Sequence, residues 1–107
     1  TFALHNDTPV TPISPLMDVF SAVNRLTSSG KVLGPAQRID VMEALRGVTI
    51  NGAYMQRLED KIGSLEKGKL ADMVILDKDP TKVDPVKLKD IMVEETIVGG
   101  NTVYKRA

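Results

Sequence analysis

The spacing of the apolar residues changes near residue 58, and this change constrains the fold more than any other feature of the sequence. Before it, four residues follow the i, i+3, i+4, i+7 spacing of one helix face: Leu16, Val19, Phe20 and Val23. After it, short apolar runs are separated by Gly and Pro, which is typical of strands joined by tight turns. The sequence therefore predicts an α+β chain with its helices first and its strands second.

The first half is expected to open on the end of a short buried strand at residues 1–4, followed by a loop and a helix over residues 15–27. Ser14 is a suitable N-cap, and Pro15 suits the first helical position because it needs no N–H partner there. The run Ser28-Ser29-Gly30 is expected to end this helix.

A second helix is expected to start after Asp40, because Glu43 follows three residues later as in a capping box. Asn51 is expected to cap a third, short helix that runs to about Arg57. Five residues are expected to form the buried face of the second helix: Val41, Met42, Leu45, Val48 and Thr49.

The second half predicts short strands. The compact run Met73–Leu76 is expected to be a strand buried on both faces, with Asp72 and Asp77 as edge and turn residues. Residues 85–90 are expected to make one or two helical turns. Two β-rich runs around Gly99-Gly100 predict a terminal hairpin.

Composition excludes several kinds of partner. The 14 basic and 14 acidic residues are interspersed, so no basic face is present for nucleic acid or for an anionic membrane surface. The absence of cysteine excludes disulfides and thiolate metal sites, and it is typical of a cytoplasmic protein. No apolar run approaches the roughly 20 residues of a membrane-spanning helix.

Four segments, in this order, resemble the amidohydrolase superfamily, and in particular amidohydrolase family 3, the YtcJ-like group. Residues 2–10 are similar to that group's strand-8 motif, which ends in His-Ser-Asp-x-Pro, with Asn6 in place of Ser. Residues 43–53 resemble a helix ending in Thr-x-Asn-x-Ala, and residues 61–77 resemble the superfamily's C-terminal signature. Residues 96–104 match the family's last hairpin.

The resemblance implies an α/β parent protein, of which this chain is the C-terminal part. Residues 1–57 would be the last strand-helix unit of a (β/α)8 barrel, and residues 58–107 would be C-terminal strands of a small β-sandwich. The parent would be a metal-dependent amidohydrolase that hydrolyses C–N bonds of non-peptide amides, with a divalent metal, expected to be zinc, and a small-molecule substrate.

Asp7 and His5 are the candidate site residues. In the family the strand-8 Asp binds metal and acts as general base, so the resemblance assigns both roles to Asp7 within the complete barrel. Without the resemblance, Asp7 would instead be a carboxylate that bonds its own loop backbone, as in an Asx turn. His5, two residues earlier on an extended segment, would face the same side. It is interpreted as an orienting residue, a substrate contact or a packed histidine.

The 107 residues alone are expected to be inactive. Catalytic zinc takes three protein ligands and a water, whereas the chain has one His, no Cys and one well-placed Asp. The expected partner is the rest of the parent chain. Cut off from it, the apolar faces of helices 15–27 and 40–57 would be exposed, and the piece would self-associate or stay partly disordered.

Two other hypotheses remain open from the sequence. The chain could be a non-catalytic regulatory or interaction module that kept an amidohydrolase scaffold. It could also be an independent small α+β domain whose motif matches arise by chance.

Overall fold

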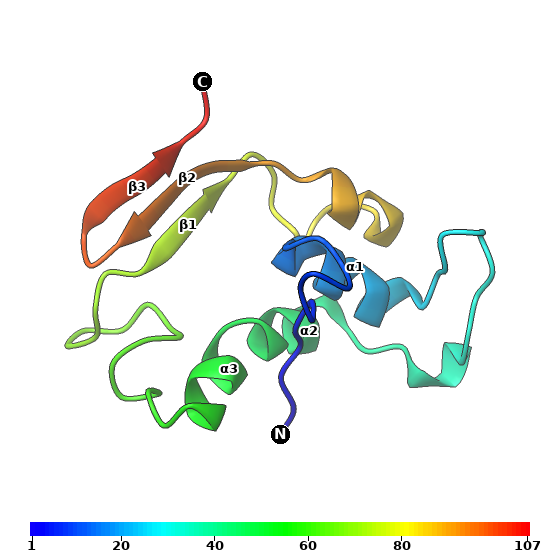
Figure 1. Cartoon of the computed structure of the whole chain (residues 1–107), viewed down its shortest axis with the longest axis horizontal. Coiled ribbons are helices and arrows are strands. Elements are labelled where there is room, and N and C mark those ends of the chain that lie inside the picture. The colour runs from blue at the N-terminus through cyan, green and yellow to red at the C-terminus, as the bar shows by residue number, and fades with distance from the viewer.

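The computed structural model describes all 107 residues and has the expected order of helices first and strands second (Figure 1). Three α-helices precede a three-stranded antiparallel sheet, and two 3₁₀ helices lie in the connections. The elements are α1 (Pro15–Asn24), η1 (Pro35–Gln37), α2 (Val41–Gly47), α3 (Ile50–Met55), β1 (Met73–Leu76), η2 (Pro85–Asp90), β2 (Val93–Val98) and β3 (Asn101–Lys105). No helix is long and apolar enough to span a bilayer.

Helix α1 begins where the sequence predicts and ends earlier. The Ser14 hydroxyl accepts a hydrogen bond from the Met17 N–H at 3.3 Å, which confirms the N-cap. The helix stops after Asn24 because Arg25 adopts the left-handed conformation, with φ 55°. The predicted stop at residues 28–30 is wrong, since those residues form the turn between Leu26 and Val32.

Helix α2 has the predicted cap and part of the predicted buried face. The Asp40 carboxylate accepts from the Glu43 N–H at 2.9 Å. Ala44 and Gly47 are buried, whereas Met42 is 47% exposed. A Cβ at Gly47 would lie 3.1 Å from Leu4 Cγ, so the missing side chain is what admits the N-terminal segment. The predicted apolar face is right in part: Val41, Leu45 and Val48 are half-buried and pack against the core, whereas Met42 and Thr49 are exposed.

Helix α3 begins two residues earlier than predicted. Thr49 occupies the N-cap position without a side-chain capping bond, and Ile50 is the first helical residue. Asn51 therefore lies inside the helix and is not its cap. The helix ends at Met55, close to the predicted end.

Residues 1–4 do not form a strand. Their one backbone hydrogen bond to another element runs from the Leu4 N–H to the Gly47 carbonyl, at 3.0 Å. A strand requires a neighbouring strand to satisfy its backbone groups, and in this chain β1 and β3 both pair with β2 and not with residues 1–4. The predicted strand therefore lacks a partner here.

The sheet has the order β1-β2-β3, with antiparallel pairing throughout. Gly99 and Gly100 form the turn of the β2–β3 hairpin with φ 57° and 83°, as the predicted hairpin requires. The prediction that β1 is buried on both faces is wrong: Met73, Val74 and Ile75 are 37–50% exposed. Only Leu76 of this strand packs against the core.

The core lies between α1, α2 and η2, to the right of the sheet in Figure 1. It contains Val19, Phe20, Val23, Ala44, Leu88 and Ile91. Asn24 joins α1 to η2, because its side-chain amide donates to the Phe20 carbonyl at 3.0 Å and to the Pro85 carbonyl at 2.9 Å. Leu88 and Ile91 belong to the second half of the chain, so the core crosses residue 58. The boundary there stays a prediction.

The surface of the chain is large for its size. The accessible area is 7668 Å², about 1,800 Å² more than the roughly 5,900 Å² of a compact monomer of 11.7 kDa. The sheet carries the largest group of exposed apolar side chains: Met73, Val74, Ile75, Val98, Val103 and Tyr104. On α1 only Met17 among the large apolar side chains is exposed, because η2 and α2 cover the apolar stripe of that helix. The expected exposure of the α1 face was therefore wrong.

Candidate functional site

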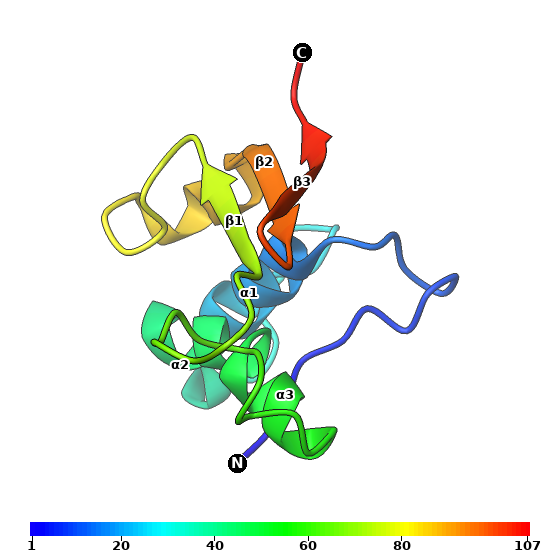
Figure 2. The ribbon, with the colours of Figure 1, turned by 90° about the vertical axis from the view of Figure 1, so that its left-hand side faces the viewer.

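The loop between Asn6 and Ser14 carries the candidate catalytic residue. Figure 2 shows that the segment before α1 loops away from the helices and the sheet. Its two ends are joined by the side chain of Asn6. The Asn6 amide oxygen accepts from the Ser14 N–H at 3.0 Å, and its NH₂ group donates to the Ser14 carbonyl at 3.2 Å. The same NH₂ group donates to Asp18 Oδ1 at 2.9 Å.

Asp7 lies at the start of the turn that this loop makes. Its backbone is left-handed, with φ 53°, and its carbonyl accepts from the Val10 N–H at 2.8 Å. Its side chain is exposed, and its carboxylate accepts no hydrogen bond and forms no ion pair within the chain. An Asx turn made by Asp7 is thus absent, and the neighbouring Asn6 makes the side-chain bonds to the loop. The Asp7 carboxylate is free to meet a proton donor from outside the chain.

His5 lies beside Asp18. Burial raises the pKa of the half-buried Asp18 carboxyl, and the charge of His5 opposes this by lowering it. Residues two apart face the same side only on an extended backbone. The chain begins a turn at Asp7, so the expectation that His5 and Asp7 share a side does not apply here.

Sequence reasoning missed Asn6 and Asp18 as parts of this loop. Asn6 was noted only as a replacement for Ser. A signal was available, because Asn side chains commonly bond to nearby backbone and a helix start follows at Ser14. Asp18 sits in the first turn of that helix, where a carboxylate is favourable.

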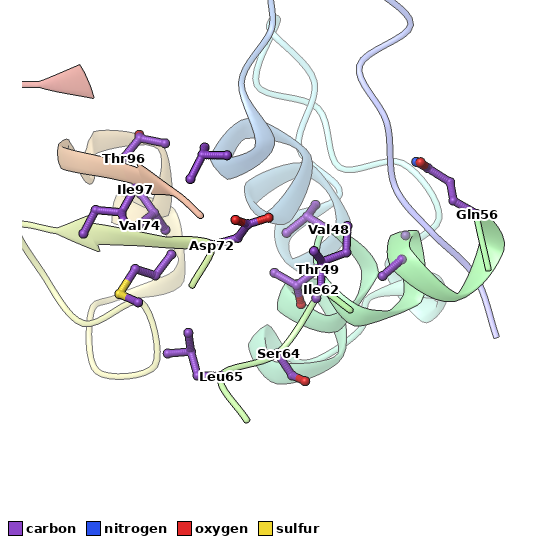
Figure 3. A pocket seen from close by; sticks show the side chains of 15 residues that line it. Val48, Thr49, Gln56, Ile62, Ser64, Leu65, Asp72, Val74, Thr96 and Ile97 are labelled. Atoms are coloured by element: carbon purple, nitrogen blue, oxygen red, sulfur yellow. The ribbon is translucent and has the colours of Figure 1, made fainter. Parts of the chain in front are cut away.

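A groove of about 580 Å³ lies between the sheet and the α2–α3 segment. In Figure 3 it is bounded on one side by Val74, Thr96 and Ile97, and on the other by Val48 and Ile62. Its lining is mostly apolar, and Asp72 is its only titratable group. The groove has one acid and several hydroxyl groups, but its lining contains no second acid and no base to activate them, so we place the candidate site at Asp7.

Asp72 and Asp77 both hold backbone in place, which agrees with their interpretation as edge and turn residues. Asp72 Oδ1 accepts from the Gly99 N–H at 2.7 Å and so ties the hairpin turn to the start of β1. Asp77 Oδ1 accepts from the Met92 N–H at 2.9 Å, at the other end of the same strand pair.

Asp72→Ala is expected to loosen the hairpin. A hydrogen bond to a charged acceptor contributes about 1.5–3 kcal/mol, and partial exposure places this one near the lower end. Amides of residues 93–105 should therefore exchange with deuterium about 10-fold faster in the full-length protein, as mass spectrometry would measure. Asp60→Ala, which removes an exposed carboxylate without a hydrogen bond, is the control. Equal exchange in the two variants would contradict the assignment.

The residues present do not make a metal site by themselves. No group of three or more His, Asp or Glu side chains lies close enough to hold a metal ion. Asp7 is accessible as one ligand. Any metal held at this position would need its remaining ligands from residues outside the 107.

The comparisons with known proteins that follow point to one family. A family model described as the amidohydrolase family matches residues 1–104. The N-substituted formamide deformylase of Arthrobacter pascens is 36% identical over 104 residues, which is 97% of this chain and 19% of the relative. The putative amidohydrolase YtcJ of Bacillus subtilis is 30% identical over 105 residues, covering 95% of this chain and 20% of the relative.

A solved structure agrees with these relatives. The crystal structure of an amidohydrolase from Thermotoga maritima superposes with a TM-score of 0.73 and 28% sequence identity. The match covers 97% of this chain and 23% of that chain. The chain thus spans about a fifth of the length of the proteins it matches.

Proposed function

The chain belongs to the amidohydrolase family, and on this premise we propose that it is the C-terminal part of a larger hydrolase that cleaves the C–N bond of a non-peptide amide. The observation that carries the proposal is the Asp7 carboxylate, which is exposed and unpaired within the family's motif. The similarity to a protein named N-substituted formamide deformylase supports an amide substrate. We take N-substituted formamides as the first substrate class to test.

In the parent protein, residues 1–57 would complete a (β/α)8 barrel and residues 58–107 would contribute strands to a small β-sandwich. Two features support this. The extended residues 1–4 contact Gly47 and have no partner strand. The sheet leaves Met73, Val74 and Ile75 exposed, as strands do when their covering layer is missing. The surface excess of about 1,800 Å² would be covered by the rest of the parent.

We propose that Asp7 acts as the general base. It would accept a proton from the water that attacks the amide carbonyl, and would return it to the departing nitrogen. The products are a carboxylic acid and an amine. A divalent metal, proposed to be zinc, would find most of its ligands outside this chain, because these residues alone do not form a metal site.

The test is an amide-hydrolysis assay on the full-length protein with a panel of N-substituted formamides and longer amides, in which released amine is quantified. Turnover above the uncatalysed rate supports the proposal. The absence of turnover across the panel, in a folded and metal-supplemented protein, would instead favour the alternative of a regulatory or interaction module on the same scaffold.

The isolated chain 1–107 is expected to lack turnover and to self-associate. Its exposed sheet residues include Val74, Val98 and Val103, each at least half exposed, and contiguous apolar surface drives association. Sedimentation velocity from about 5 to 200 µM should show a rising weight-average mass, by the concentration dependence of association. Val74→Lys should reduce it, and Lys82→Ala, at an exposed site away from the sheet face, should not. A constant monomer mass in the wild type would contradict the expectation.

A further inference from the structure

The side chain of Asn6 makes three hydrogen bonds at one point of the fold. Its oxygen accepts from the Ser14 N–H, and its two N–H groups donate to the Ser14 carbonyl and to Asp18 Oδ1, at 3.0, 3.2 and 2.9 Å. A second contact crosses the same loop, because the Thr11 hydroxyl donates to the Asn6 carbonyl. The backbone of residue 6 is therefore anchored to the first turn of α1.

This anchor determines where Asp7 lies. Asp7 is the next residue, so its Cα is about 3.8 Å from that of Asn6. The Asp7 carboxylate has no contact of its own within the chain that would hold it. Within these 107 residues, its position follows from the backbone that Asn6 holds.

The set of contacts is specific to a carboxamide. A hydroxyl has a single donor, so Ser at position 6 could not donate to both Ser14 and Asp18. A carboxylate at position 6 has no N–H or O–H group, so it could not donate to the Asp18 carboxylate or to the Ser14 carbonyl. Asp18 is thus matched to Asn6, and the two side chains form a pair.

We infer that Asn6, paired with Asp18, is a positioning residue that holds Asp7 in place for catalysis. The functional part of this inference rests on the proposed function, whereas the positional part does not. A displacement of about 1 Å in a reacting group can cost about 100-fold in rate. Loss of the anchor should therefore lower kcat and leave KM largely unchanged, since Asn6 itself is not placed against substrate.

The test uses the full-length protein. Asn6→Ser, the residue more usual in the family motif, is expected to fold and to lower kcat about 10- to 100-fold, with KM changed by less than about 3-fold. Asn6→Asp should lower kcat at least as much. The double variant N6D/D18N restores a donor opposite the new carboxylate and should recover about 10-fold of that loss. Asn101→Ser, the same change in the exposed β2–β3 hairpin, is the matched control.

A crystal structure of the Asn6→Ser protein separates this inference from the proposed function. An Asp7 Cα displaced by about 1 Å, or an Asp7 loop without an ordered conformation, supports the positioning role, with or without measurable turnover. An Asp7 that keeps its wild-type position overturns it, and so does an unchanged kcat in an active enzyme. Failure of N6D/D18N to recover activity overturns the pairing with Asp18. A wild-type protein without turnover on any amide refutes the proposed function alone.

Discussion

Asp7→Asn in the full-length protein is expected to lower kcat/KM for amide hydrolysis by about 10²- to 10⁴-fold, the contribution of a positioned general base. The amide cannot accept a proton from the attacking water, yet it is close to the carboxylate in size. Asn also tolerates the left-handed backbone that Asp7 adopts, with φ 53°. The exposed Asp7 side chain makes no contact that the substitution would remove, so stability should stay within about 0.5 kcal/mol of wild type.

Initial rates across substrate concentration give kcat and KM separately, and thermal unfolding checks the fold. Asp60→Asn is the matched control, because it makes the same chemical change at another exposed carboxylate. If Asp7→Asn keeps more than about a tenth of the wild-type kcat/KM, Asp7 is not the general base. Equal losses in the two variants would point to a general effect of surface charge.

Leu88→Ala should cost about 2–5 kcal/mol of stability, which is the range for removing a buried leucine side chain. Leu88 is 0% exposed and packs in the core beside Val19 and Phe20. It lies on η2, whereas those partners lie on α1, far earlier in the chain. The cavity should therefore loosen α1 as well as the segment that carries the substitution.

Hydrogen exchange of the full-length protein can locate this effect. Peptides from residues 15–24 and from residues 85–98 should both lose protection in Leu88→Ala. Val86→Ala on the same short helix, where the side chain is 44% exposed, should cost less than about 1 kcal/mol. Loss of protection confined to residues 85–98 would mean that the two halves unfold separately, and would favour the predicted boundary near residue 58.

Local chemistry explains which elements the sequence could predict. Ser14 and Asp40 start helices through bonds to N–H groups three residues ahead, and Gly99-Gly100 turns a hairpin because both residues tolerate positive φ. The two partners of each interaction lie within a few residues of each other, so a short stretch of sequence is enough to predict them. The helix ends were harder to predict, because α1 stops at a left-handed Arg25 that no propensity favours.

Burial was predicted less well, for a different reason. Whether Met73–Leu76 is covered depends on elements that are distant in sequence or outside these residues. Met42 was expected inside and lies outside, because the N-terminal segment contacts α2 at Gly47. An apolar pattern shows which side chains favour burial, but it does not show what is available to cover them.

The sequence by itself determined the α+β order, the caps at Ser14 and Asp40, the hairpin, the family and the candidate carboxylate Asp7. Only the tertiary structure decided that η2 completes the core on α1, that residues 1–4 lack a partner strand, and that Asn6 anchors the Asp7 loop to Ser14 and Asp18. The physical reason is the sequence separation between the residues that interact. Caps and turns are satisfied by neighbours along the chain, whereas core contacts and loop anchors depend on which distant residues the fold brings within hydrogen-bonding or van der Waals distance.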